Sequence, residues 1–137
     1  MEQATTMKLI PIIIAILATP SDAGDRAMSA AEFEAAVTGR TLSYALGGRA
    51  YGIEEYLRNR RVRWSFLDGE CHEGSWFPDG ENICFVYETL DSAQCWQFFD
   101  HAGDLSAVFQ GDGTTTELFD AQDAGEKLEC LGPKIGV

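Results

Sequence analysis

Two histidines are the side chains of this chain best suited to acid–base chemistry near neutral pH. They are His72 and His101, and each could act as the base for a serine nucleophile, with Ser75 or Ser106 as the candidate. That pairing would be the chemistry of a hydrolase. Neither serine lies in a G-x-S-x-G motif, and alternation along a strand separates such pairs as often as it joins them. We therefore rank a hydrolase last and expect no catalytic residue.

Paired carboxylates are the next candidates for chemistry. Glu54 and Glu55 are adjacent, so in a strand their side chains point to opposite faces and cannot share one substrate. Asp79-Gly80, in the expected turn Pro78-Asp79-Gly80, and Asp112-Gly113 have the composition of turns, and the spacing of a calcium-binding loop is absent. We expect neither a metal ion nor a cofactor.

The chain has four cysteines: Cys71, Cys84, Cys95 and Cys130. None belongs to a C-x-x-C pair, which argues against a zinc site and against a redox-active thiol pair. An even number in an exported chain indicates two disulfides, for which three connectivities are possible. Cys84 and Cys95 fall on neighbouring strands of one expected hairpin. We therefore expect that bridge, with Cys71–Cys130 tying the C-terminal segment to the sheet.

A local group of basic residues stands out against an acidic background. It comprises Arg58, Arg60, Arg61 and Arg63. This arginine group could receive an anion or an acidic protein partner. The alternative, which we favour, is that the arginines pair with acidic side chains of neighbouring strands. Those side chains are Glu54, Glu55, Glu70 and Glu73.

The overall charge limits the class of partner. Lys+Arg number 10 and Asp+Glu 22, which gives a formal net charge of −12. A surface this negative repels phosphate backbones and anionic lipid headgroups, so we expect neither nucleic acid nor membrane as a partner of the mature protein. The acidity is typical of a surface selected for solubility.

The N-terminus has the pattern of a secretory signal peptide. Lys8 precedes an apolar run over residues 9–18, which is shorter than the ~20 residues that a membrane-spanning helix needs. Small residues at Ser21 and Ala23 then place the expected cleavage after Ala23. We interpret residues 1–23 as a signal and residues 24–137 as one β-rich domain that is periplasmic or secreted. The alternative is that the apolar run is a buried strand or a membrane anchor.

One short helix is expected at the start of the domain. Ser29 is the expected N-cap, Glu32 completes a capping box, and Gly39 supplies the residue that ends the helix. Phe33 and Val37 are four positions apart and therefore share the apolar face.

Beyond Gly39 the periodicity changes to that of strands. Apolar and aromatic runs alternate with turn signals, and we expect strands over residues 41–46, 51–57, 61–67, 71–77, 83–88, 95–99, 105–109 and 114–119, followed by an extended segment over 127–131. About eight strands with short connections indicate an all-β antiparallel meander, either a barrel or a sandwich. The runs Ile83–Tyr87 and Cys95–Phe99 are apolar on both faces, so we expect the helix to cover their second face.

Two resemblances add to this interpretation. The run D-G-E-C-x-x-G-x-W-x-x-D-G-x-x-I-C-F-x-Y-E, followed by C-W-x-F, covers Asp68 to Phe98 and resembles a motif of small exported bacterial proteins of unknown function. The resemblance implies a periplasmic or secreted domain and brings no catalytic residues. The helix followed by a meander is more weakly similar to calycin-type barrels, the lipocalins and small protease inhibitors. This chain has Gly39-Arg40-Thr41 where lipocalins have G-x-W.

Two functions of different kinds remain. The first is a non-enzymatic exported domain that binds a protein partner or a component of the cell envelope. The second is a small barrel that holds an apolar ligand in an aromatic-lined cavity. A ligand-binding barrel should have an open interior lined by aromatic rings. A partner-binding domain should have a filled core and an exposed apolar or arginine-rich patch.

Overall fold

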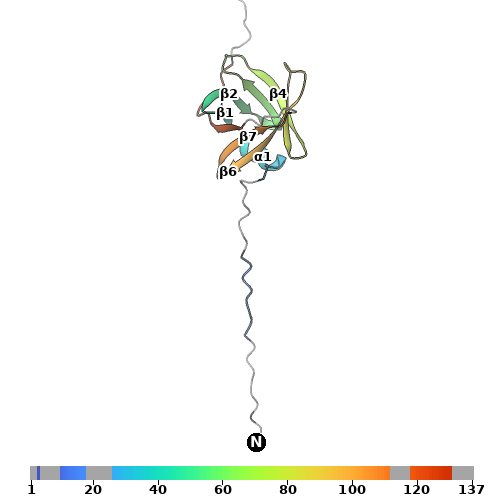
Figure 1. The fold of residues 1–137 in the computed structure, drawn as a ribbon, viewed down its shortest axis with the longest axis vertical. Helices are drawn as coiled ribbons and strands as arrows, with labels where there is room; N and C mark the ends of the chain where they lie inside the picture. The colour runs from blue at the N-terminus through green and yellow to red at the C-terminus, as the bar shows by residue number, and fades with distance from the viewer. Residues whose placement is uncertain (1–2, 4–9, 18–25, 112–117, 131–137) are drawn as a thin grey trace, which may run out of the picture.

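Eight antiparallel strands close into a barrel in the computed structural model, which describes residues 3, 10–17, 26–111 and 118–130 (Figure 1). The strands are β1 (Thr41–Leu46), β2 (Arg49–Tyr56), β3 (Arg61–Ser65), β4 (His72–Asp79), β5 (Asn82–Tyr87), β6 (Gln94–His101), β7 (Asp104–Phe109) and β8 (Leu118–Asp123). Each strand pairs with the next, and β8 pairs with β1. The predicted meander is therefore confirmed as a barrel, and closure leaves no unpaired sheet edge.

Most predicted strand boundaries differ from the observed ones by up to two residues, and the differences in β4 and β8 have a structural reason. The turn expected at Pro78 belongs to β4, where Pro78 pairs with Ile83. Pro78 lies beyond the last β3–β4 pair, Arg61 with Ser75, so β4 has one partner strand fewer there and tolerates a residue without an N–H.

The last strand also lies later in the chain than predicted. β8 occupies Leu118–Asp123 because residues 119–123 pair with β1, whereas residues 114–117 of the predicted strand lie outside the described residues. Of the extended segment predicted over 127–131, residues 127–130 belong to no strand, and residue 131 lies outside the described residues.

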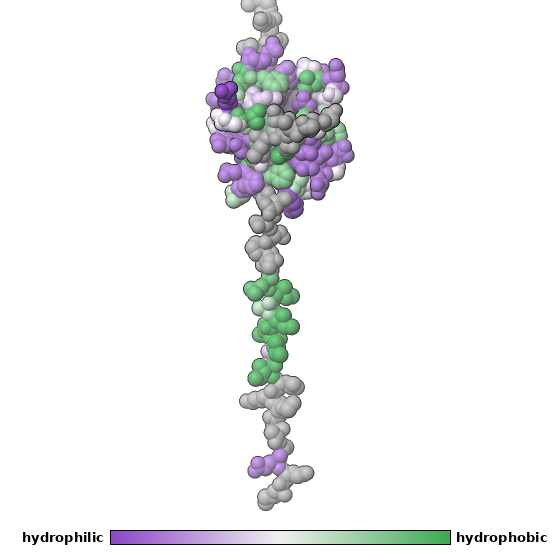
Figure 2. Space-filling view, viewed as in Figure 1, coloured by the Kyte–Doolittle hydropathy of each residue, from purple (hydrophilic) through white to green (hydrophobic). Residues whose placement is uncertain are grey.

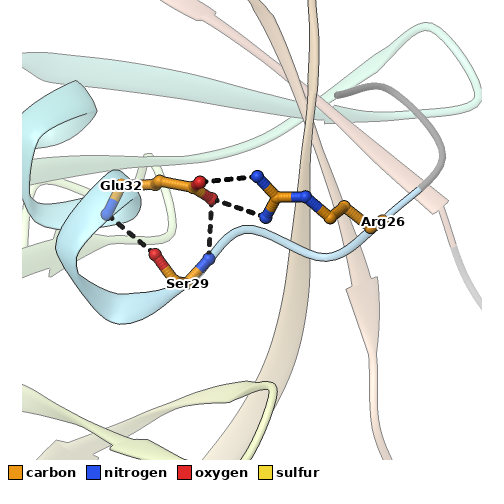
Figure 3. A network of polar contacts seen from close by, with 3 residues as sticks. All are labelled: Arg26, Ser29 and Glu32. Atoms are coloured by element: carbon orange, nitrogen blue, oxygen red, sulfur yellow. Dashed lines mark hydrogen bonds and ion pairs between the residues drawn. The ribbon is translucent and has the colours of Figure 1, made fainter. Parts of the chain in front are cut away.

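The helix α1 (Ala30–Val37) begins as its sequence predicts. Ser29 Oγ accepts a hydrogen bond from the Glu32 N–H at 3.2 Å, and Glu32 Oε2 accepts one from the Ser29 N–H at 3.0 Å (Figure 3). The guanidinium of Arg26 adds two bonds to the same carboxylate, at 2.7 and 3.0 Å. These contacts, that of Arg26 first, lower the pKa of Glu32 to about 2. The capping box is confirmed, and Gly39, with φ +82°, follows the helix.

Removing the cap should weaken the fold measurably. We expect Ser29→Ala to lower the free energy of unfolding by about 1 kcal/mol, because the Glu32 N–H loses its acceptor. Urea denaturation would measure the difference. Ser92→Ala, an equal change in an exposed connection between β5 and β6, is the control. An equal midpoint for the two variants would contradict the role of the cap.

α1 closes one end of the barrel, as Figure 1 shows. Phe33 and Val37 are fully buried. The ring of Phe33 lies 5.1 Å from that of Trp76 and 4.3 Å from that of Phe98, centroid to centroid. The prediction that the helix covers the outer face of β5 is wrong, since Val86 on that face is 40% exposed. The helix instead packs Phe33 against rings of β2, β4 and β6 at one end of the barrel.

Two disulfides brace the barrel, and both follow the predicted pairing. Cys84 and Cys95 occupy paired positions of β5 and β6 and are bonded to each other. Cys71, just before β4, is bonded to Cys130, beyond β8. Cys71–Cys130 therefore joins the segment after β8 to the side of the barrel that carries β4.

The apolar N-terminal segment is not part of the barrel. The isoleucines of residues 10–17 and Leu17 are 80–90% exposed, and the segment extends away from the folded unit (Figure 2). The alternative that this run is a buried strand is therefore wrong for residues 10–17. In the part of the chain that the structure describes, no helix has the length and hydrophobicity needed to cross a membrane.

Candidate functional site

The half of the barrel away from α1 contains a cavity of ≈ 70 Å³. Its walls are mainly aromatic, and Tyr44, Trp64, Tyr87, Trp96 and Phe119 contribute rings to it from five different strands. A cavity of this size has room for several water molecules or for a small organic molecule. The open, aromatic-lined interior that a ligand-binding barrel requires is thus present among the described residues.

The cavity reaches the surface at the end opposite α1. Tyr51, Phe66 and Leu90 line it there, and their exposed fractions are 39%, 45% and 38%. These residues lie close to the β1–β2, β3–β4 and β5–β6 connections, which meet at that end because each strand runs antiparallel to the next. A ligand would therefore enter between these connections. The rings that pack against Phe33 of α1 form the floor of the cavity.

A buried carboxylate lies in the cavity wall. Glu54 is 2% exposed and lines the cavity from β2, where it pairs with Leu42 and Trp64 of the two adjacent strands. The hydroxyl of Tyr87 donates a hydrogen bond to Glu54 Oε1 at 2.8 Å. Glu54 Oε2 has no hydrogen-bond partner among the described residues. A buried acceptor left without a donor is rare in folded proteins and indicates a missing partner.

The surroundings of Glu54 shift the pKa of its carboxyl group. Burial raises the pKa of Glu54 well above its usual value, and the bond from Tyr87 offsets only part of that effect. Among the described residues, no lysine or arginine lines the cavity to favour the carboxylate form.

Two further tyrosines complete the polar groups beside Glu54. The hydroxyls of Tyr44 and Tyr56 lie 2.6 Å apart and bond to each other. Burial raises the pKa of both, so both stay neutral at physiological pH. Each of these two hydroxyls has a partner, whereas Glu54 Oε2 is a buried side-chain oxygen without one among the described residues.

Two glycines make room for the rings around Glu54. A Cβ at Gly52 would collide with the indole of Trp64, and a Cβ at Gly74 would collide with the carbonyl oxygen of Val86 and the ring of Tyr87. The missing side chains let these rings lie against the backbone of the adjacent strand. The cavity wall therefore depends on glycine at both positions.

The burial of Glu54 predicts a distinctive dependence of stability on pH. Because its pKa is higher in the folded protein, the unfolded chain loses its proton first as the pH rises above about 4.5. Stability should therefore fall with rising pH. Glu54→Gln removes this contribution, so we expect the variant to be more stable than the wild type by about 1–3 kcal/mol at pH 8 and to match it at pH 4. Urea denaturation at both pH values tests this prediction. A difference in the free energy of unfolding between the two proteins that is equal at pH 4 and pH 8 would contradict it.

The histidines do not form a site in the cavity floor. His101 Nε2 lies 3.3 Å from Ser106 Oγ, but His101 is exposed, and neither residue lines the cavity. Among the described contacts of His101, no carboxylate orients the ring, as a catalytic histidine requires. His72 lines the cavity near its opening, where its Nδ1 lies 2.8 Å from Thr89 Oγ1 rather than beside Ser75.

Two members of the arginine group are in ion pairs. Arg63 Nε lies 2.7 Å from Glu73 Oε1, and Arg60 Nη2 lies 3.4 Å from Glu34 Oε2. Arg60 also covers the ring of Trp76, with 4.6 Å from its guanidinium carbon to the ring centroid. Of the predicted acidic partners, Glu73 is correct, whereas Glu54 is wrong because it points into the barrel. Arg58 and Arg61 are exposed.

The sequence predicted Glu54 and Glu55 to lie on opposite faces of a strand, and the structure agrees. The prediction gave Glu54 no role at a functional site. The signal was available in the alternation of the strand, since Glu54 shares its strand face with the aromatic residue Tyr56, which is buried. A carboxylate on the apolar face of a strand is a candidate site residue.

The fold and the site together define a closed eight-stranded meander barrel with one end plugged by a helix and an aromatic cavity in the other. Comparison with known proteins finds no matching family model, no matching curated protein and no matching solved structure. Both resemblances described above therefore stay predictions.

Proposed function

We propose that this protein is a binding protein that holds a small, largely apolar molecule in the barrel cavity. The observation that carries the proposal is the aromatic-lined cavity that is open at one end and closed by α1 at the other. Concave sites with apolar walls and few polar groups are the usual form of small-ligand sites.

The proposal reverses the order of the two functions considered from the sequence. Partner binding came first, and a filled core with an exposed apolar or arginine-rich patch was the feature that would distinguish it. The cavity leaves the core unfilled in one half of the barrel, and Arg60 and Arg63 are engaged with Glu34 and Glu73. Both observations favour the ligand-binding function.

Dye binding tests the proposal. The neutral apolar dye N-phenyl-1-naphthylamine should gain fluorescence with the wild-type protein and lose this response in Ala107→Phe. Ala107 lines the cavity and is 2% exposed, so a phenyl ring there would occupy the ligand volume. The matched control is Val108→Phe, which adds a similar bulk at the next position, outside the cavity lining.

Circular dichroism would first establish that both variants are folded, since overpacking costs about 1–3 kcal/mol. Equal fluorescence responses from folded Ala107→Phe and Val108→Phe would overturn the proposed function.

We also propose that the chain is exported and that residues 1–23 are removed. The exposed apolar segment over residues 10–17 lies outside the barrel, and two disulfides are typical of proteins that fold in an oxidising compartment. Export from bacterial cells should yield a product whose N-terminal residue is Gly24. N-terminal sequencing measures this, and a cytoplasmic product that retains residues 1–23 would contradict it.

A further inference from the structure

Glu54 Oε2 is the starting point for naming the class of ligand. It is a nearly fully buried carboxylate oxygen in the wall of an otherwise apolar cavity, and no described residue donates to it. Its companion atom, Oε1, is bonded to Tyr87 Oη at 2.8 Å, which holds the side chain in place. In the carboxylate form of Glu54, this oxygen is therefore a preorganised acceptor for a donor that no described residue supplies.

The surroundings of this oxygen favour a positively charged donor. Tyr44, Trp64, Trp96 and Phe119 line the same cavity, and the faces of such rings attract cations. In the part of the chain that the structure describes, no lysine or arginine lines the cavity to compete for the carboxylate. The net charge of −12 also raises the local concentration of cations around the whole molecule.

We propose that the ligand is a small organic amine whose ammonium group donates a hydrogen bond to Glu54 Oε2 while its apolar part lies among the aromatic rings. This inference rests on the proposed function and names the chemistry of its ligand. An anionic ligand is disfavoured by Glu54. The cavity of ≈ 70 Å³ is open at one end, so a bound molecule larger than this volume extends through the opening.

Matched probes separate the contribution of the ligand's charge to its binding affinity from the contribution of its apolar part. Three amine–alcohol pairs serve: butylamine and 1-butanol, 2-phenylethylamine and 2-phenylethanol, and tryptamine and tryptophol. Titration calorimetry at pH 7 should show at least one amine binding about 10- to 100-fold more tightly than its alcohol, the range expected for one charge-assisted hydrogen bond.

Two neighbouring variants complete the test. Glu54→Gln keeps the shape of the side chain and should abolish the preference for the amine, leaving the alcohol affinity within about threefold. Glu55→Gln removes the same formal charge from the opposite face of β2 and does not line the cavity, so it should keep the preference. An amine preference that survives in Glu54→Gln would overturn the inference.

Proton release gives a second readout. The titratable groups that line the cavity with Glu54 are Tyr44, Tyr51, Tyr56 and Tyr87, from β1, β2 and β5, and His72 near the opening. Ammonium binding requires the carboxylate form, whereas burial raises the pKa of Glu54. Amine binding should therefore release a proton in the wild type and none in Glu54→Gln, as calorimetry in phosphate and Tris buffers would measure. Equal release from the two proteins would count against the inference.

The outcomes also distinguish this inference from the proposed function. If N-phenyl-1-naphthylamine binds but no amine binds more tightly than its alcohol, the barrel is a ligand-binding protein and only the amine assignment fails. If the dye, the amines and the alcohols all fail to bind, both proposals fail.

Discussion

Phe33→Ala is expected to lower the free energy of unfolding by about 3–5 kcal/mol, the range for a large aromatic side chain removed from a core. Phe33 is fully buried at the end of the barrel. Its ring contacts those of Tyr56, Trp76 and Phe98, at centroid distances of 5.7, 5.1 and 4.3 Å. Those three residues come from β2, β4 and β6, so one side chain links three strands that are not adjacent. An eight-residue helix cannot refill the space by shifting alone.

Phe77→Ala is the matched control for this change. Phe77 is 42% exposed, so the same truncation should cost less than about 1 kcal/mol there. Urea denaturation of the two variants at neutral pH gives both values. Equal losses would contradict the role of α1 as the plug of the barrel.

The local features of this fold could be predicted because their partners lie close together in the chain. Ser29 and Glu32 form the capping box within one helical turn. Alternation within each run located the strands, and Cys84 and Cys95 flank a single hairpin. Each of these features depends on residues whose relative positions follow from the periodicity of the chain alone.

Features that depend on distant parts of the chain could not be predicted in the same way. Pro78 was interpreted as a turn because nothing local shows that β3 ends before reaching it. The place of α1 depends on rings that come from β2, β4 and β6, so its apolar face alone did not show which surface it covers. Glu54 acquires its environment from Tyr87, which is 33 positions away. A single strand pattern contains no information about that contact.

Removal of the Cys71–Cys130 disulfide should lower the free energy of unfolding by about 4 kcal/mol, through the entropy of the 59-residue loop that it closes. Cys84–Cys95 closes a loop of 11 residues and should contribute about 3 kcal/mol. The double variants Cys71→Ala/Cys130→Ala and Cys84→Ala/Cys95→Ala would be compared by urea denaturation.

The Cys71–Cys130 disulfide has a second effect, which depends on its position in the barrel and not on the length of the loop that it closes. β4 and β8 are four strands apart in either direction around the barrel, so the chain after β8 must cross half its circumference to reach Cys71. The bridge thus holds that segment against the opposite side of the barrel. Lys127 is exposed. In limited proteolysis, the rate of cleavage after Lys127 should be higher in Cys71→Ala/Cys130→Ala than in the wild type. Cys84→Ala/Cys95→Ala, whose bridge lies within one hairpin, should be cleaved there at the wild-type rate. Equal rates at Lys127 in the two double variants would show that the segment is held without the disulfide.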